Sequence, residues 1–251
     1  MQLKQLNYLV LALAFFVATM SGVLIGINAI QTTQQTTSFE KLGEHTLTAQ
    51  APVLAVSSQT NEGILSHVDI EIQKGRGRVL INTNPFVEAD TQYSADTAVR
   101  VAQEITGKDL SDRDVIFTFD PISNLVGGPS AGAALTIGTI AAIQGKTLNP
   151  EIAITGTINE DGSIGQIGGV FEKAQAASQQ GITLFLVPKG QETLNYLERQ
   201  VTQEQRGPFI IERTSYVPRS LDLVAYAEKE WSLQVQPASN IQEAMELMIQ
   251  P

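Results

Sequence analysis

A serine flanked by glycines, and a lysine 43 positions after it, are the residues of this sequence whose types suggest covalent chemistry. The segment Gly128-Pro129-Ser130-Ala131-Gly132 matches G-x-S-x-G, a pattern that presents a serine hydroxyl on a sharp turn before a helix. Small residues also occur at such turns for geometric reasons alone, so this motif by itself is weak evidence. A serine hydroxyl becomes an effective nucleophile only when a neighbouring group accepts its proton.

The sequence offers no suitable histidine to act as that base. An α/β-hydrolase needs a histidine after its serine, and none follows Ser130. His45 lies in a polar segment, and His67 alternates with acids on the polar face of an expected strand. With two histidines and no cysteine, the chain cannot build a three-histidine or thiolate metal site, a disulfide or a cysteine nucleophile. We therefore expect neither a metal nor a cofactor.

Lys173 is a candidate base of another kind. A lysine accepts a proton only when neutral, which requires its pKa to fall from about 10.4 to roughly 7–8. It follows Gly168-Gly169-Val170-Phe171 near the start of an expected alanine-rich helix. Apolar surroundings and the positive end of a helix both disfavour an ammonium ion. Taken alone, however, a lysine on a helix is most often a solvated surface charge.

Residues 114–188 resemble the proteolytic domain of the Lon proteases, a family of Ser-Lys peptidases. The sequence GPSAG at 128–132 corresponds to the family's nucleophile motif. The sequence ITGTINEDGSIGQIGGVFEKAQAASQQGITLFLVP at 154–188 corresponds to the block that carries the base, at the family spacing. Weaker likeness extends over most of residues 51–251. The resemblance implies a Lon-type fold and peptide-bond hydrolysis.

The resemblance also implies a role for individual residues. Ser130 would be the nucleophile and Lys173 the general base, with Thr155 helping to orient the lysine amine. Backbone N–H groups of the segment formed by Gly128, Pro129 and Ser130 would shape the oxyanion site at a helix amino terminus.

This sequence departs from the family pattern in several places. Gly127 stands where many members have an acid, and Thr157 replaces the glutamate of Thr-Gly-Glu. Residues 190–230 are longer than the expected connection, and we interpret them as a lid, an oligomer contact or a substrate guide. No G-x-x-x-x-G-K-[ST] motif occurs, so we expect no ATPase module within these residues.

The elements that must position these groups indicate an α+β domain over residues 51–251. Periodicity and turn residues predict strands at 52–57, 67–73, 79–83, 115–119, 151–155, 183–187 and 233–236. Helices are expected at 94–106 with Ser94 as its cap, at 130–144, from about 170 to Gly181, and at 241–248. The segment 190–230 shows no clear period.

The amino-terminal part of the chain indicates a membrane anchor. Residues 6–30 form 25 mostly apolar positions without a charge, enough to span a bilayer core of roughly 30 Å. We interpret residues 1–30 as a single transmembrane helix and residues 31–50 as a polar tether, with a signal peptide as the alternative. Lys4 and the terminal amine favour an inside amino terminus, which would place the main domain outside the cytoplasm. The formal charge of −10 argues against nucleic-acid binding.

Together these observations predict an ATP-independent serine endopeptidase of the cell membrane that cleaves unfolded proteins or peptides. A homo-oligomeric ring and a separate ATPase partner are further expectations of the family resemblance. Two alternatives remain open: a proteolytically silent Lon-like scaffold or ring-forming module, and a peptidase held inactive until a partner binds.

Overall fold

The computed structural model describes residues 40–41, 45–82, 84–120 and 125–250. The chain divides into two units, residues 1–38 and residues 39–251, and every described residue belongs to the second unit. The expected transmembrane segment and most of the expected tether therefore lie outside the described residues. Within the described ranges, no helix combines the length and the apolar character needed to cross a membrane.

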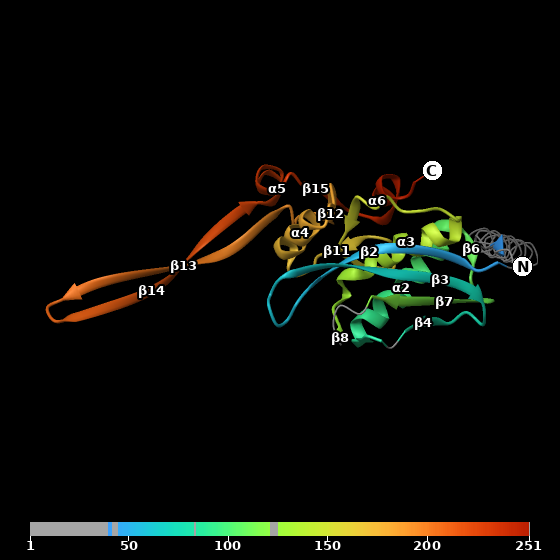
Figure 1. Ribbon diagram of the computed structural model, residues 1–251, viewed down its shortest axis with the longest axis horizontal. Coiled ribbons are helices and arrows are strands. Elements are labelled where there is room, and N and C mark those ends of the chain that lie inside the picture. Colours follow the sequence, from blue (N-terminus) through green and yellow to red (C-terminus); the bar gives the residue numbers. More distant parts are fainter. Residues whose placement is uncertain (1–39, 42–44, 83, 121–124, 251) are drawn as a thin grey trace, which may run out of the picture. The chain divides into compact units, whose positions relative to one another are not determined.

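A four-stranded sheet forms one side of the domain, in the order β2-β3-β7-β4 (Figure 1). Its strands are β2 (Leu47–Val56), β3 (Gly63–Lys74), β4 (Val79–Ile81) and β7 (Arg113–Phe119). β3 pairs antiparallel with β2 and β7, whereas β4 pairs parallel with β7. β2 begins four residues before the expected end of the tether, because the pairing with β3 starts at Leu47.

Two helices pack together beneath this sheet. α2 (Ala89–Thr106) begins five residues earlier than expected, and Ser94 is a buried residue inside it and not its cap. α3 (Gly132–Gln144) follows a short 3-10 turn, η1 (Pro129–Ala131). Every residue of α3 except Gln144 is buried, since α2, the sheet and α6 (Ile241–Met248) surround it. A helix that is apolar on all sides is typical of a protein core.

A second, parallel sheet lies beside the first, in the order β15-β12-β9. It contains β9 (Ile152–Ile154), β12 (Leu184–Pro188) and β15 (Gln234–Ala238). α4 (Val170–Gln179) packs against β3 and β2 and shares a separate hydrophobic cluster with β12 and α5 (Leu223–Trp231). The expected strands at 151–155, 183–187 and 233–236 and the expected helix from about 170 are thus present, with ends shifted by one or two residues. α5 was not expected, because it lies mostly in the segment that showed no clear period.

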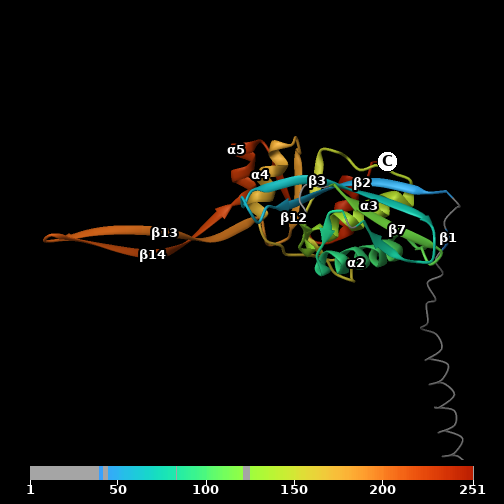
Figure 2. The ribbon, with the colours of Figure 1, turned by 60° about the horizontal axis from the view of Figure 1, so that its bottom comes forward.

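Three short pairings join β1 (Glu40–Lys41) with β6 (Lys108–Asp109), β5 (Phe86–Val87) with β8 (Leu125–Val126), and β10 (Thr157–Ile158) with β11 (Ile164–Gly165). The remaining described strands, β13 (Thr193–Arg206) and β14 (Phe209–Asp222), form a long antiparallel hairpin. Figures 1 and 2 show this hairpin extending away from the other elements of its unit.

The hairpin lies in the segment for which the sequence showed no clear period. Its turn is Gly207-Pro208, and Gly207 has a φ of 63° that suits the first central position of a two-residue hairpin turn. Apolar residues occur on both faces of these strands, so their sequence does not alternate between apolar and polar positions. The period of two that usually marks a strand is therefore missing. The mixture of antiparallel hairpins, a parallel sheet and helices confirms the α+β fold class.

Candidate active site

Ser130 lies in the 3-10 turn η1, directly before the buried helix α3. The following Gly132 has a packing reason to be glycine, because a Cβ there would stand 2.7 Å from Ile158 Cγ2 and 2.9 Å from its backbone nitrogen. This close approach brings the start of α3 against β10. Two backbone bonds join the same segments: Gly156 N–H donates to Ser130 O at 3.0 Å, and Ala133 N–H donates to Gly156 O at 3.0 Å.

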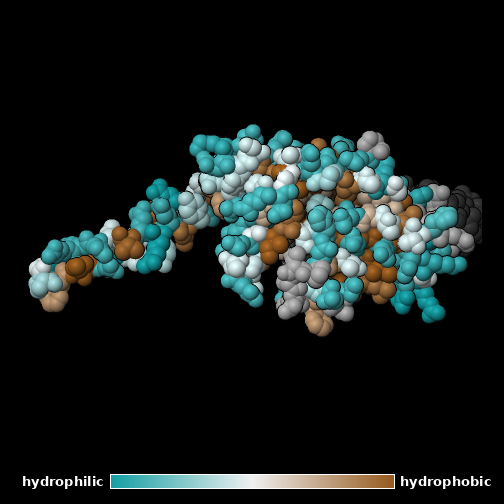
Figure 3. Space-filling model, viewed as in Figure 1, coloured by the Kyte–Doolittle hydropathy of each residue, from teal (hydrophilic) through white to brown (hydrophobic). Residues whose placement is uncertain are grey.

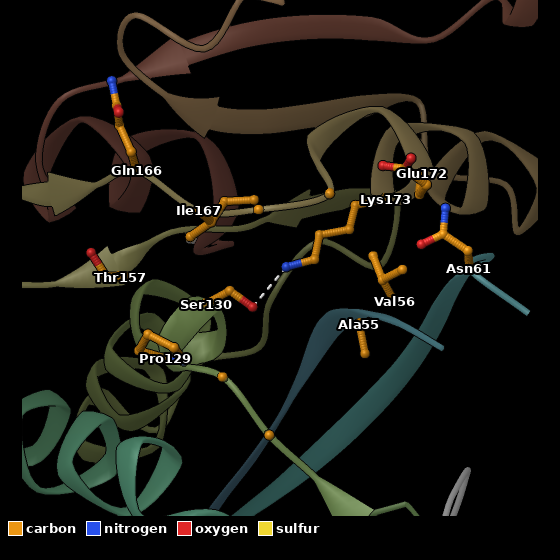
Figure 4. A pocket seen from close by; sticks show the side chains of 14 residues that line it. Ala55, Val56, Asn61, Pro129, Ser130, Thr157, Gln166, Ile167, Glu172 and Lys173 are labelled. Carbon is orange, nitrogen blue, oxygen red and sulfur yellow. Dashed lines mark hydrogen bonds between the residues drawn. The ribbon is translucent and has the colours of Figure 1, made fainter. Parts of the chain in front are cut away.

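Lys173 reaches Ser130 from the first turn of α4. Its Nζ lies 2.7 Å from Ser130 Oγ, although the two residues are 43 positions apart (Figure 4). The lysine side chain is buried, with 3% of the residue exposed. Burial lowers the pKa of Lys173 from 10.5 to about 8, because removal from water disfavours the ammonium ion. The sequence-based candidates for nucleophile and base therefore come together in a poorly solvated position.

Thr155, the third residue that the resemblance singled out, contacts both of the other two. It is buried at the end of β9, and its Oγ1 accepts a hydrogen bond from Lys173 Nζ at 3.4 Å. The same hydroxyl donates to Ser130 O at 3.2 Å. The threonine hydroxyl is thus fixed by the serine backbone and offers one of the few polar contacts to the lysine amine.

A pocket of about 650 Å³ opens beside this pair. Its wall combines the end of β2, the Gly127–Ser130 segment, Thr157 and the loop 166–169 before α4. In Figure 4, Val56 and Asn61 lie on one side of the Ser130–Lys173 contact and Thr157 and Gln166 on the other. Ser130 forms part of this wall, so a carbonyl group that entered the pocket could approach its hydroxyl.

The amino-terminal turns of α2 brace the segment before the nucleophile, which sequence reasoning missed. Thr91 Oγ1 donates to Gly128 O and Ser94 Oγ donates to Pro129 O, both at 3.2 Å. Gly128 N–H donates to Asp90 Oδ1 at 3.3 Å. Little in the sequence indicated these contacts, because short polar residues at the start of a helix are usually explained by capping alone.

This bracing changes the expectation for the oxyanion site. Gly128 N–H already has the Asp90 carboxylate as its acceptor, and proline has no N–H to give. Of the three expected positions, Ser130 is therefore the one whose N–H could face a substrate oxygen in this conformation. Oxyanion donors work best at 2.7–3.1 Å from the oxygen that they stabilise, so Gly128 would first have to leave Asp90.

Gly127 stands where the family usually has an acid. In this chain it lies against a carboxylate from another segment. A Cβ on Gly127 would stand 2.2 Å from Glu88 Oε2, so the Glu88 side chain occupies the space where a side chain would begin. A side chain at position 127 would therefore require the Glu88 side chain to move aside.

The base of the long hairpin is tied to the pocket wall. Gln191 Oε1 accepts from Ile167 N–H at 2.9 Å, and Gln191 Nε2 donates to Ile167 O at 2.7 Å. Both backbone groups of a pocket residue are thus held by one side chain, two residues before β13 begins. No sequence motif pointed to this glutamine, because the contact spans 24 positions and depends on the fold.

Neither histidine takes part in this arrangement. His67 lies on β3, where its Nδ1 is 3.8 Å from Asp120 Oδ2, and His45 precedes β2. Among the side chains that the structure describes, no group of three or more histidine or acidic residues is arranged to hold a metal ion.

Comparison with known proteins agrees with the geometry of this site. Residues 89–212 match the family model of the Lon protease (S16) C-terminal proteolytic domain. The chain is 30% identical over 126 residues to an archaeal Lon protease of Archaeoglobus fulgidus, covering 50% of this chain and 20% of that protein. It is 33% identical over 132 residues to a Lon protease of Acinetobacter baumannii, covering 51% of this chain and 16% of that protein.

A third relative, Lon protease 2 of Bacillus subtilis, is 28% identical over 141 residues. That match covers 51% of this chain and 25% of the relative, so the matched part spans a quarter or less of each of these proteins. The matched residues include α2, the nucleophile motif, the lysine helix and the first strand of the hairpin. Residues 89–212 of this chain therefore belong to the Lon protease (S16) C-terminal proteolytic domain family.

Proposed function

We propose that this chain is a serine endopeptidase in which Ser130 is the nucleophile and Lys173 the general base. The observation that carries the proposal is the 2.7 Å contact between Lys173 Nζ and Ser130 Oγ at a buried position where the lysine pKa is lowered to about 8. At neutral pH and above, a useful fraction of this lysine is the neutral amine that a base must be.

In the proposed reaction, neutral Lys173 takes the hydroxyl proton as Ser130 Oγ attacks the peptide carbonyl carbon. Negative charge develops on the carbonyl oxygen, and backbone N–H groups at the start of α3 would stabilise it. The Lys173 ammonium then gives its proton to the leaving amine, and an acyl-enzyme remains. A water molecule, activated by the same lysine, hydrolyses the ester and regenerates Ser130. Thr155 would hold the amine in line between these steps.

We further propose that this activity needs no ATP and acts on unfolded proteins or peptides. These 251 residues contain no P-loop motif, and the open pocket accepts an extended chain more readily than a folded one. We also propose that residues 6–30 attach the protein to the cell membrane, with the domain outside the cytoplasm. Digestion of intact cells by an added protease would test the topology, since an outside domain would be degraded without lysis.

The test of the activity is hydrolysis of casein, an unstructured protein, by the full-length chain in detergent without ATP. We expect cleavage that Ser130→Ala and Lys173→Ala abolish and that His67→Ala leaves unchanged, with circular dichroism showing that each variant is folded. If the parent protein neither cleaves nor reacts with serine-directed acylating reagents, the chain is a silent scaffold. If His67→Ala removes turnover while Lys173→Ala does not, the Ser-Lys assignment is wrong.

A second candidate, a peptidase held inactive, is favoured by the bond from Gly128 N–H to the Asp90 carboxylate. Negative charge beside the oxyanion position would oppose the transition state, and this bond occupies one donor that could stabilise it. If Asp90 holds the site closed, Asp90→Ala would raise kcat on a short peptide without changing KM. If the carboxylate instead only orients the segment, Asp90→Ala would lower kcat, and Asp90→Asn, which keeps an acceptor oxygen, would restore it.

A further inference from the structure

The hairpin of β13 and β14 presents more exposed apolar surface than any other described element. Seven of its large apolar side chains are exposed by 42–70% of their area, and they are the following: Tyr196, Leu197, Val201, Phe209, Ile210, Ile211 and Tyr216. Figure 3 shows apolar residues spread along the hairpin between hydrophilic ones. A two-stranded ribbon is marginally stable by itself in water, so apolar residues on it indicate a surface that a partner covers.

The pairing register divides these residues between two faces. Residues directly opposite one another on antiparallel strands share a face, so Leu197 lies beside Pro218, Arg199 beside Tyr216, and Gln205 beside Ile210. We call the face formed by Leu197, Val201, Ile210, Tyr216 and Pro218 the apolar face. It carries three charged residues, which are Arg199, Glu212 and, at the base of the hairpin, Asp222.

The opposite face is the more charged of the two. It carries five charged residues, which are Glu198, Glu204, Arg206, Arg213 and Arg219. Two ion pairs lie on it, Arg219 with Glu198 and Arg206 with Glu204, each at 3.0 Å. Its charges are thus largely paired within the ribbon. Three exposed apolar side chains, Tyr196, Phe209 and Ile211, lie among these charges, whereas the apolar face carries the other four with fewer charges between them.

The edges of the ribbon are open as well. In the described structure, β13 and β14 form a sheet of two strands, so each has an outer row of backbone groups without a strand partner. Natural proteins often protect such edges with proline or lysine. β14 contains Pro218, but β13 contains neither residue type over its 14 positions. The edge of β13 is therefore the better template for an added strand.

The base of the hairpin lies beside the wall of the proposed active site. Gln191, which precedes β13, holds both backbone groups of Ile167 in the pocket wall. The ribbon is also neutral, with four arginines and four acidic residues between positions 193 and 222, although the whole chain carries a charge of −10. An approaching polypeptide would therefore meet less repulsion here than at an average part of the surface.

A second copy of the chain is a poorer occupant than an extended polypeptide. A strand of 14 residues is ~45 Å long, and one face of a two-stranded ribbon is ~10 Å wide, so stacking two such faces would bury ~900 Å² in total. Stable complexes usually bury about 1,200–2,000 Å². An unfolded segment can instead pair with the edge of β13 and place alternate side chains beside those of the apolar face, which suits transient binding.

We propose that the β13–β14 hairpin is the docking surface for unfolded polypeptide substrates, which add a strand to β13 and pack alternate side chains against those of the apolar face. The bound segment would continue past Gln191 into the pocket that contains Ser130. This inference rests on the proposed peptidase function, because it assigns a substrate-collecting surface to the same site.

Binding is tested separately from turnover with full-length Ser130→Ala protein in detergent and fluorescently labelled casein. The triple variant Leu197→Thr, Val201→Thr, Tyr216→Thr keeps strand-forming residues but removes apolar surface from the apolar face. The matched control Tyr196→Thr, Phe209→Thr, Ile211→Thr makes the same number of changes on the opposite face. We expect the first triple to raise the casein Kd at least tenfold and the control to leave it within about twofold.

Turnover is then measured in proteins that retain Ser130. The substrates are casein and a peptide of about eight residues, which at ~28 Å is too short to occupy both the ribbon and the pocket. A shortened variant replaces residues 195–220 with Asn-Gly, joining the paired Leu194 and Leu221. We expect this variant and the apolar-face triple to raise KM for casein at least tenfold while cleaving the short peptide at the parental rate.

The possible outcomes separate this inference from the proposed function. Unchanged casein binding by the apolar-face triple, or an equal loss in both triples, would overturn the assignment to this face. A change in oligomeric state by light scattering, with loss of short-peptide cleavage, would show that a second copy covers the ribbon. If the parent protein cleaves neither substrate, the peptidase proposal fails, and the casein Kd alone decides whether the hairpin binds polypeptides.

Discussion

At the scale of single residues, the unusual feature is a lysine that is buried and has hydroxyl groups as neighbours. Ser130 Oγ and Thr155 Oγ1 are the side-chain partners of its amine, and neither carries a charge to balance an ammonium ion. Desolvation therefore dominates and lowers the pKa of Lys173 to about 8. A buried lysine without a counter-charge is costly to the fold, which is why perturbed groups of this kind indicate a functional site.

This pKa sets the expected dependence of activity on pH. The neutral amine is the active form, so kcat/KM for a short peptide should rise about tenfold per pH unit below the Lys173 pKa and level off above about pH 8. A profile measured from pH 5.5 to 9.5 checks this expectation. An activity that instead rises through a pKa near 6.5 and is flat above pH 7 would indicate a histidine base.

The same pKa predicts that the lysine destabilises the fold. Below pH 8 both the folded and the unfolded protein carry the ammonium ion, and its burial costs about 3 kcal/mol. Between pH 8 and 10.5 the folded protein releases the proton first, so the cost falls as pH rises. Lys173→Met should therefore increase the free energy of unfolding by roughly 1–3 kcal/mol at pH 7, and by less at pH 10.

Urea unfolding of the variant at both pH values measures this effect. Lys189→Met changes an exposed lysine and should alter the free energy of unfolding by less than about 0.5 kcal/mol. A Lys173→Met protein that is no more stable than its parent at pH 7 would mean that the ammonium ion is not desolvated.

At the scale of elements, the position of Lys173 depends on how closely β3 and α4 approach. Gly63 at the start of β3 faces the backbone of α4: a Cβ on it would stand 1.9 Å from Glu172 O and 2.9 Å from Ala176 Cβ. Glu172 directly precedes the lysine. The lack of a side chain at Gly63 thus allows the helix to sit deep enough for Nζ to reach Ser130.

Gly63→Ala should therefore separate the strand and the helix. We expect a loss of roughly 1–3 kcal/mol in stability and at least a tenfold loss in kcat, because the amine moves relative to the hydroxyl. Thermal unfolding and peptide kinetics measure the two effects. Gly168→Ala is the matched control, since nothing lies within 4 Å of a Cβ at that position; an equal effect of both changes would contradict the packing argument.

At the scale of the whole domain, the fold starts earlier than the sequence pattern indicated. Leu47 to Gln50 pair with Asp69 to Ile72, and Leu47 and Ala49 pack against the main hydrophobic core. The sequence from 47 to 50 reads Leu-Thr-Ala-Gln and continues a polar segment, so it lacked the run of large apolar residues that would have marked a strand.

A fragment of residues 51–251 should consequently be less stable than one of residues 40–251. Removing the first four of the ten residues of β2 exposes the edge of β3 and part of the core, so we expect the melting temperature to fall by at least several degrees. Differential scanning calorimetry of the two fragments compares them directly. Equal melting temperatures would show that residues 40–50 contribute nothing to the domain.

The sequence alone determined the chemical groups of the candidate site. Ser130 and Lys173 were identified because short motifs with local backbone requirements carry them, and because the absence of a later histidine left few other bases. The α+β class followed for a similar reason, since strand and helix periodicities are local properties of the chain. A lowered pKa for the lysine was also expected, from its alanine-rich surroundings.

Only the tertiary structure decided how these groups are held and what surrounds them. The bonds from Asp90, Thr91 and Ser94 to the segment before Ser130 join positions 35–38 residues apart, and the Gln191 bonds to Ile167 span 24. The hairpin at 193–222 has apolar residues on both faces, so no period revealed it, and its existence depends on long-range strand pairing. Contacts between distant residues arise from the packing of whole elements, which spacing along the chain does not encode.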